Sequence, residues 1–100
     1  MSNYPNAKII EYSSHLELKM KIRGIPKTLP KKIFKEATEK YLDTDTSYYI
    51  ALKKVKYKNK IRDMIVVFEE LNDVIRIITI HPLKSYQKEA RIKTGRWKKL

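Results

Sequence analysis

Hydrophobic residues in the second half of the chain follow the pattern of β-strands. Three runs rich in β-branched and aromatic residues are separated by short turns near Asn59 and at Asn72–Asp73. Turns of this length join antiparallel neighbours, so the runs predict a meander of strands. Near-continuous apolar stretches in the second and third runs indicate that both faces of these strands are covered. The predicted strands are Tyr48–Lys58, Ile61–Glu70 and Val74–His81.

The first half of the chain predicts a short edge strand followed by two helices. Lys8–Tyr12 is short and apolar, as an edge strand is. Residues His15–Arg23 alternate at the period of a strand, but unbranched side chains dominate, a serine precedes them and Gly24 follows them, which favours a helix. Apolar residues recurring every four positions predict a second helix from Thr28 or Leu29 to about Leu42. Its predicted buried face consists of Leu29, Ile33, Ala37 and Tyr41.

The end of the chain predicts one more short helix, which Ser85 caps and which ends before Gly95. The 100 residues are therefore expected to form a single α+β domain. In this domain, two N-terminal helices pack on a three- to four-stranded antiparallel sheet. Residues 1–7 are expected to be flexible, and residues 84–100 to form a basic C-terminal segment.

Positive charge is concentrated in two segments of this domain. The chain carries 23 Lys and Arg against 11 Asp and Glu, a formal net charge of +12. Residues 53–62 contain six basic residues and no acidic one, and residues 84–100 contain seven and one, so each segment contributes +6 and the rest is neutral. Such clustering indicates a phosphate-bearing partner, although lysines used for solubility give the same count. Tyr57, Tyr86 and Trp97 lie among the cations, which favours single-stranded or looped RNA because bases stack on such rings.

Composition also excludes several chemistries. The absence of cysteine excludes disulfides, zinc–thiolate sites and thiol nucleophiles. Because His15 and His81 are the only histidines and no tight acidic cluster occurs, we expect neither a metal site nor a cofactor. No apolar run approaches the roughly 18 residues of a membrane span, and the N-terminus lacks the apolar region of a signal peptide. The sequence therefore predicts a cytoplasmic protein without a membrane partner.

A row of basic residues lies along the first strand of the meander. Lys54, Lys56 and Lys58 share one face of that strand by alternation, and Arg62 lies near the same turn on the next strand. The row fits a track for a nucleic-acid backbone. It fits equally well the solvated side of an edge strand, which charge protects from aggregation.

A second set of basic residues recurs along the first helix. His15, Lys19 and Arg23 are four residues apart and lie between the apolar flanks Leu16–Met20 and Leu18–Ile22. A cationic stripe in this position is expected either to open onto a cleft or to reach water from the edges of a buried face.

The two histidines suit general acid–base catalysis on a phosphodiester. His81 ends a buried strand just before the basic C-terminal segment, where a hydrogen-bonded structural role is the alternative. In metal-independent RNA cleavage, a base removes the 2′-hydroxyl proton, the oxygen attacks the adjacent phosphorus, and an acid protonates the leaving 5′-oxygen. Guanidinium groups are well suited to stabilise the charge on the phosphoryl oxygens. The candidates are His15 and His81 as acid and base, Arg23, Arg91 and Arg96 as phosphate stabilisers, and Lys93 as an additional charge.

Three stretches of the chain resemble a family of small, mostly uncharacterised proteins. They are His15-x7-Arg23-Gly24-Ile25, Ile78-Thr-Ile-His81-Pro82 and Arg91-Ile-Lys93-Thr-Gly95-Arg96-Trp97. The family is similar to the RelE-type toxins of the barnase–colicin–RelE grouping of metal-independent ribonucleases. The resemblance covers nearly the whole chain and implies two N-terminal helices on an antiparallel sheet, RNA cleavage in a groove across the sheet, and for many members an antitoxin partner. The chain departs from several RelE-like subfamilies in ending with Trp97-Lys-Lys-Leu100 rather than with a Tyr or His.

We therefore expect a metal-independent endoribonuclease that acts on mRNA or another structured RNA and has an acidic antitoxin as its protein partner. Two alternatives stay open at this point. The first is a domain of the same shape that binds RNA or DNA without cleaving it, and the second is a toxin-like protein that acts mainly through an acidic partner. The residues expected to bind nucleic acid are Lys54, Lys56, Lys58, Arg62, Lys93 and Trp97.

Overall fold

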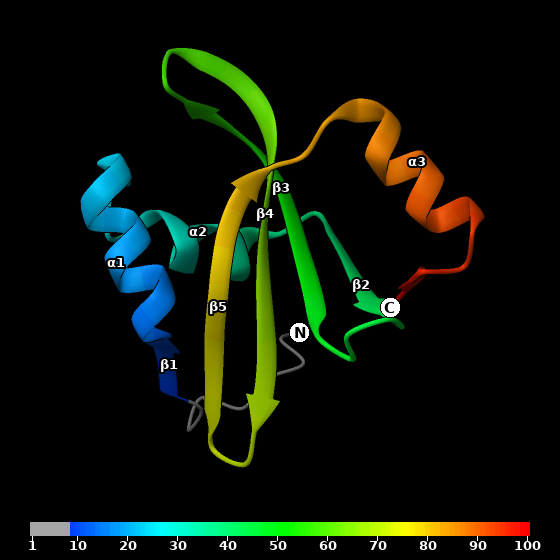
Figure 1. Ribbon diagram of the computed structural model, residues 1–100, viewed down its shortest axis with the longest axis horizontal. Helices are drawn as coiled ribbons and strands as arrows, with labels where there is room; N and C mark the ends of the chain where they lie inside the picture. Colours follow the sequence, from blue (N-terminus) through cyan, green and yellow to red (C-terminus); the bar gives the residue numbers. More distant parts are fainter. Residues whose placement is uncertain (1–8) are drawn as a thin grey trace.

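The computed structural model describes residues 9–100, which form three helices and six strands (Figure 1). The helices are α1 (Ser14–Arg23), α2 (Leu29–Glu36) and α3 (Ser85–Lys93). The strands are β1 (Ile9–Tyr12), β2 (Glu39–Asp43), β3 (Tyr49–Tyr57), β4 (Lys60–Leu71), β5 (Val74–Pro82) and β6 (Trp97–Lys99). They pair in the order β1-β5-β4-β3-β2-β6 into one sheet, in which β1 runs parallel to β5 and every other pair is antiparallel.

This architecture is α+β, but the expected three- to four-stranded antiparallel sheet under two N-terminal helices is wrong. The sheet is six-stranded and mixed, and a sixth strand follows the third helix. That helix lies where the sequence predicts it, before Gly95, but Lys84 and not Ser85 occupies its N-cap position. The meander itself is present as β3, β4 and β5, with tight turns between the strands. The edge strand is also present from Ile9 onward, whereas residues 1–7, which were expected to be flexible, lie outside the described part of the chain.

The second helix ends at Glu36, earlier than predicted, and the chain then forms β2. Ala37 already has extended dihedral angles (φ −54°, ψ 133°). Tyr41, which was predicted to lie on the buried face of the helix, pairs with Ile50 and stacks on Trp97 with 5.3 Å between ring centroids. The partner that buries Tyr41 thus comes from the other end of the chain, so local spacing did not reveal the strand.

Helix α1 begins and ends as the sequence predicts. The hydroxyl of Ser13 accepts a hydrogen bond from the N–H of Leu16 at 3.0 Å, and Gly24 ends the helix with a φ of 64°. Only one of the two apolar flanks is buried, because Leu16 and Met20 enter the core whereas Leu18 and Ile22 are 58% and 73% exposed. One edge of the helix therefore packs, and the other edge and the cationic stripe remain on the surface.

Both faces of the sheet carry hydrophobic clusters. On one face, α1 and α2 cover a cluster to which β3, β4 and β5 contribute, including an edge-to-face contact between Phe34 and Phe68 with ring centroids 4.8 Å apart. On the opposite face, a smaller cluster gathers around β2, β6 and the segment that leads into α3. Its buried members are Tyr41, Ile50, Leu52, Ile65, Leu83 and Trp97.

The hairpin between β3 and β4 extends beyond the rest of the sheet. Pairing between β4 and β5 ends at Met64 and Pro82, whereas β3 and β4 remain paired as far as Tyr57 and Lys60. We call residues 54–63 the hairpin arm. Figure 1 shows the arm curving away from the sheet toward the end of α1 where that helix meets the connection to α2.

Candidate functional site

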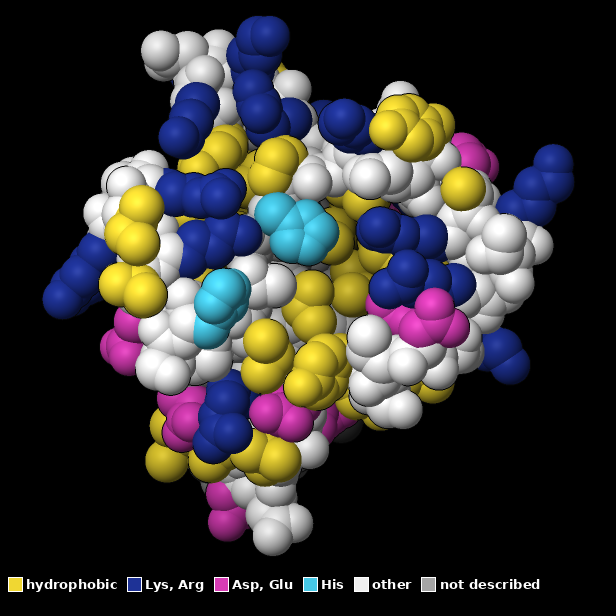
Figure 2. Space-filling model, in the orientation of Figure 1, with side chains coloured by type: hydrophobic (Ala, Val, Ile, Leu, Met, Phe, Trp, Pro, Cys, Tyr) yellow, Lys and Arg dark blue, Asp and Glu magenta, His cyan; other side chains and the backbone are white. Residues whose placement is uncertain are grey.

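The face of the sheet opposite α2 carries basic residues from three separate elements. It lies between α1 and α3, and Figure 2 shows an apolar floor on this face, with Lys and Arg side chains on both sides and both histidines between them. His81 of β5 is directly opposite Ile65 of β4, and Thr79 is opposite Val67, so these four side chains lie on the same side of the sheet. We call this surface, with Lys19 and Arg91 at its sides, the open face.

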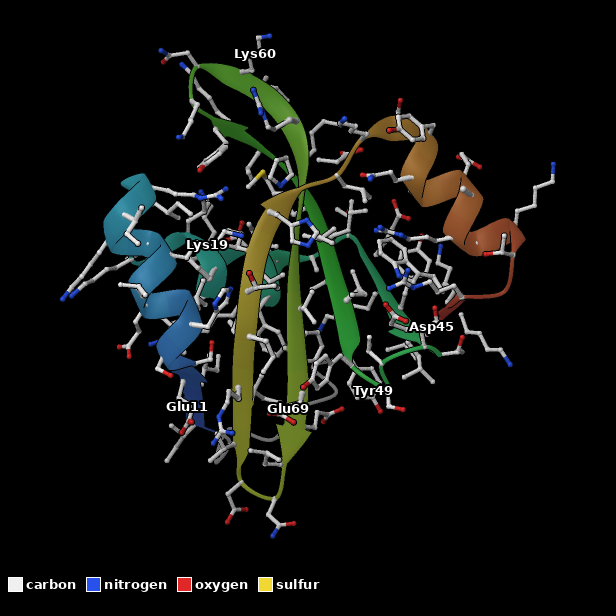
Figure 3. The ribbon with its side chains drawn as sticks, in the orientation of Figure 1. Glu11, Lys19, Asp45, Tyr49, Lys60 and Glu69 are labelled. Atoms are coloured by element: carbon white, nitrogen blue, oxygen red, sulfur yellow. The ribbon has the colours of Figure 1, made fainter. Side chains whose placement is uncertain are left out.

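Lys19 connects α1 to the edge of β5. The parallel pairing of β1 with β5 ends at Tyr12 and Ile77, which leaves the following part of the edge of β5 without a strand partner. Lys19 reaches this edge, and its Nζ donates hydrogen bonds to the carbonyl of Ile80 at 2.6 Å and to Oγ1 of Thr79 at 3.3 Å (Figure 3). An ammonium group has three N–H donors, so one is left for a ligand on the open face.

The surroundings of Lys19 make its ammonium group more acidic than that of an exposed lysine. Burial lowers the pKa of Lys19 below its ordinary value, and the positive charge of Arg23 lowers it further. The sequence placed Lys19 in the cationic stripe without giving it a role in the site. The signal that identifies it is its contact with β5, which is visible only once α1 lies along that edge.

His81 is half-buried and lies between two cations. Burial is the main cause that lowers its pKa, and the charges of Lys19 and Arg91 act in the same direction, whereas the backbone oxygen of Pro82 acts against them. Nδ1 of His81 lies 3.3 Å from that oxygen. A carbonyl only accepts, so Nδ1 carries the proton and Nε2 keeps its lone pair. The imidazole is therefore neutral near pH 7 and able to accept a proton at Nε2.

Arg91 of α3 lies on the other side of His81. Its guanidinium group stacks over the ring of Trp97 at 5.2 Å from the centroid, and it forms no ion pair or hydrogen bond with the side chains of residues 9–100. Trp97 was expected to contact nucleic acid, but its side chain is only 2% exposed and lies against Tyr41 as well. Trp97 therefore supports Arg91, whose N–H groups are available for phosphate oxygens.

Arg96 has a different role from the one that the sequence suggested. Its Nε lies 3.3 Å from both carboxylate oxygens of Asp43, and its Nη2 lies 3.2 Å from Oδ2. Asp43 is 4% exposed; burial raises the pKa of its carboxyl, but the hydrogen bonds from Arg96 and from the backbone of Asp45 outweigh this and hold the pKa below its usual range. Arg96 thus joins the end of β2 to the start of β6 by an ion pair. The N–H groups of its guanidinium that form this pair are not available to a phosphate.

Two other catalytic candidates, His15 and Arg23, lie on α1 beside the open face. His15 is exposed on α1, one turn before Lys19, and both line a shallow depression of about 380 Å³ with Arg23. Figure 2 shows the two histidines on the same face of the molecule, as a shared site requires. Arg23 is exposed at the last position of α1, and Lys93 is exposed at the last position of α3.

The predicted lysine row is not continuous. Lys54 pairs with Asp63 across the hairpin, with 3.1 Å between Nζ and Oδ1. Strand β3 ends at Tyr57, so Lys58 belongs to the turn; it has a positive φ of 51°, and its ammonium lies 5.6 Å from the centroid of the Tyr57 ring. The expectation that Lys54, Lys56 and Lys58 share one strand face is therefore wrong at Lys58, because the turn reorients it.

Arg62 belongs to the hairpin arm and lies beside His81 of the open face. Its guanidinium group lies 5.9 Å from the centroid of the Tyr57 ring, and its Nε is buried without a hydrogen-bond partner. Together with His81, Lys60 and Lys84, it lines a pocket of about 390 Å³ at the end of β5. This pocket is basic and contains no carboxylate, so it can accept an anionic group beside His81.

The described part of the chain offers neither a metal-binding cluster nor a membrane-spanning helix. Among residues 9–100, no three histidine or carboxylate side chains lie close enough together to hold a metal ion. Within the same range, no helix is sufficiently long and apolar to cross a lipid bilayer. No family model matches the chain, and neither a curated protein nor a solved structure shows a significant match to it.

Proposed function

We propose that the protein is a metal-independent endoribonuclease of the cytoplasm that cleaves RNA on the open face. The observation that carries this proposal is the convergence of Lys19, His81 and Arg91 from α1, β5 and α3. A neutral imidazole between two cations combines a base with groups that stabilise a phosphorane-like transition state. The resemblance of three stretches of the chain to RelE-type ribonucleases agrees with this chemistry.

In the proposed mechanism, each of these groups has its own role. Nε2 of His81 accepts the proton of the 2′-hydroxyl, whose oxygen then attacks the adjacent phosphorus and expels the 5′-oxygen. The third N–H of Lys19 and the guanidinium group of Arg91 donate to the phosphoryl oxygens as negative charge develops on them. His15, which lies one turn from Lys19, is the group that protonates the leaving oxygen. The product is a 2′,3′-cyclic phosphate and a free 5′-hydroxyl.

The test is cleavage of labelled RNA by the purified protein in EDTA. We expect products that end in cyclic phosphate or 3′-phosphate, and no cleavage of the same RNA made with 2′-O-methyl sugars, because these lack the nucleophile. His81→Gln is expected to lower the rate by about 10²–10⁴-fold, the usual contribution of general base catalysis, while binding of the 2′-O-methyl RNA is retained. If the wild-type protein binds this RNA in a salt-sensitive manner but cleaves no RNA, the enzymatic proposal is wrong.

One observation favours a second candidate, a domain that binds RNA without cleaving it. The guanidinium group of Arg96 is occupied by Asp43, so Arg91 is the one arginine of residues 84–100 whose N–H groups remain available to a phosphate. A single arginine is sufficient for binding, whereas ribonuclease catalysis benefits from several such donors. Retention of RNA binding by the wild-type protein together with the absence of products in EDTA identifies this candidate.

A further inference from the structure

A second basic cavity lies beside the tip of the hairpin arm. It has a volume of about 450 Å³ and is formed by the α1–α2 connection, the first turn of α2 and the arm. We call it the hairpin cleft. Its lining includes Gly24, Thr28, Lys32, Lys56, Tyr57 and Lys58.

The charge of this cleft is not balanced by the protein. Lys32, Lys56 and Lys58 line it, no acidic residue does, and none of the three lysines forms an ion pair with a residue between 9 and 100. Three ammonium groups around one cavity repel one another, and this repulsion is relieved when an anion binds between them. The cleft therefore favours an anionic ligand.

Neutral groups in the cleft also suit a phosphate. Thr28 occupies the N-cap position of α2, but its hydroxyl makes no capping hydrogen bond, so the hydroxyl is available to a ligand. At Gly24, a Cβ would meet no atom within 4 Å, so the backbone there is open to close approach. The cations are held in place on the arm side, since Lys58 lies over the ring of Tyr57.

The position of the cleft connects it to the open face. Arg23, the last residue of α1, lines the depression that contains His15 and Lys19, and the next residue, Gly24, lines the hairpin cleft. Figure 1 shows the arm curving toward this end of α1, and Figure 3 marks Lys60 at the tip of the arm. A strand that leaves the open face past Arg23 can therefore reach the cleft by passing around this end of α1.

We propose that the hairpin cleft binds a backbone phosphate of the same RNA strand whose scissile bond lies on the open face. This inference rests on the proposed function. It adds a second, remote phosphate-binding site to that function and predicts that RNA long enough to reach both sites binds more tightly than RNA that reaches only one. Sequence-independent contacts of this kind position a strand without reading its bases.

The experiment compares two RNAs and two charge-matched variants of the full chain. The RNAs are labelled 2′-O-methyl oligouridylates of about 4 and about 16 nucleotides, which span the range of usual single-strand site sizes. The first variant, Lys32→Gln with Lys56→Gln, removes two charges from the cleft. The control, Lys98→Gln with Lys99→Gln, removes two exposed charges from β6. Affinity is measured by fluorescence anisotropy, and equal thermal midpoints confirm that both variants are folded.

We expect the cleft variant to bind the longer RNA roughly tenfold more weakly than the wild type does, as expected for the loss of charge-assisted contacts at an exposed site. Its affinity for the shorter RNA is expected to change less than about twofold, and the control variant is expected to behave as the wild type with both RNAs.

The outcomes separate this inference from the proposed function. If the wild-type protein binds neither RNA, the proposed function fails. If it binds both RNAs and the two variants lose the same amount of affinity for the longer RNA, the proposed function stands and the hairpin cleft is not a binding site. If a polyglutamate peptide binds the cleft more tightly than the longer RNA does, its ligand is an acidic protein and the inference is overturned.

Discussion

Arg91 and Arg96 show how differently two arginines of one short segment are used. Both belong to the basic end of the chain, and from the sequence both are candidates to hold a phosphate. The guanidinium group of Arg91 lies over the ring of a buried tryptophan with its N–H groups unpaired by side chains, whereas Arg96 forms an ion pair with the buried carboxylate of Asp43. The difference depends on Asp43, which lies in β2, so nothing in the local sequence of the segment distinguishes the two residues.

Glutamine substitutions of the two arginines are expected to have opposite effects. Arg96→Gln leaves Asp43 buried and uncompensated, so the free energy of unfolding is expected to fall by about 1–3 kcal/mol, less than for a fully buried pair because the arginine is partly exposed. Arg91→Gln removes a cation–π contact worth about 0.5–1 kcal/mol, but it is expected to abolish most RNA cleavage. Urea denaturation and cleavage assays on the two variants measure both quantities. Equal stability of the two variants contradicts the roles assigned here.

Protonation of His81 makes the free energy of unfolding depend on pH. Its pKa in the native state is below that of the unfolded chain, mainly because of burial. Above about pH 7 the imidazole is neutral in both the native and the unfolded state, so it does not make the free energy of unfolding depend on pH. As the pH falls through about 6.5, the unfolded chain takes up the proton first, so the free energy of unfolding decreases until the pH is below the native pKa.

The measurement is urea denaturation at several pH values between about 7.5 and 5, which bracket the ordinary histidine pKa. The decrease is expected to be smaller in His81→Gln than in the wild type. The matched control is His15→Gln, in which the His81 contribution is unchanged. An identical decrease in wild type and His81→Gln shows that other groups cause it.

At the scale of the elements, α3 is attached by few contacts. None of its residues is buried, and two interactions join it to the sheet, namely the stacking of Arg91 on Trp97 and the ion pair of Lys88 with Glu39, 2.8 Å long. Glu39 also accepts a hydrogen bond from the hydroxyl of Tyr41, and the bonds from Lys88 and Tyr41 together lower its pKa. The carboxylate of Glu39 on β2 is therefore one of the two contacts that position the helix carrying Arg91.

Glu39→Gln is expected to loosen α3 while leaving the sheet intact. The amide hydrogens of α3 are expected to exchange faster, with a change in opening free energy of about 1 kcal/mol or less, as for other partly exposed ion pairs. The amides of β4, the central strand, are expected to exchange at the wild-type rate. Hydrogen exchange followed by NMR measures the exchange rates of the α3 amides and of the β4 amides separately. Faster exchange throughout the sheet contradicts a local role for Glu39.

The elements that the sequence predicted correctly are those whose partners are near in the chain. The three strands of the meander are joined by tight turns, and α1 is bounded by a capping serine and a glycine, so period and turn residues are sufficient to identify them. β2 and β6 are short and pair with each other from distant parts of the chain. The apolar residues of β2 therefore fitted a helical spacing equally well, and Trp97 was interpreted as a ligand-binding ring instead of a buried one.

At the scale of the whole molecule, folding divides the basic residues into those that balance acids and those that do not. Lys54, Lys88 and Arg96 form ion pairs within the protein. Lys19, Arg23 and Arg91 surround the open face, and Lys32, Lys56 and Lys58 line the hairpin cleft. Among residues 9–100, these six cations have no carboxylate partner. Part of the net charge of +12 is thus presented to a ligand by two neighbouring sites, although the sequence showed only that the charge was concentrated in two segments.

This arrangement predicts the salt dependence of RNA binding. Each phosphate contact on a single strand contributes about −0.7 to the slope of log K against log salt concentration, so six contacts give a slope of about −4.2. The slope is measured with 2′-O-methyl RNA of about 16 nucleotides, long enough to reach both sites. Lys32→Gln with Lys56→Gln is expected to reduce its magnitude by about 1.4, the share of two contacts, whereas Lys98→Gln with Lys99→Gln leaves it unchanged. A slope that responds equally to both pairs means that the lysines act only as a diffuse charge, which is the solubility role that composition alone also permits.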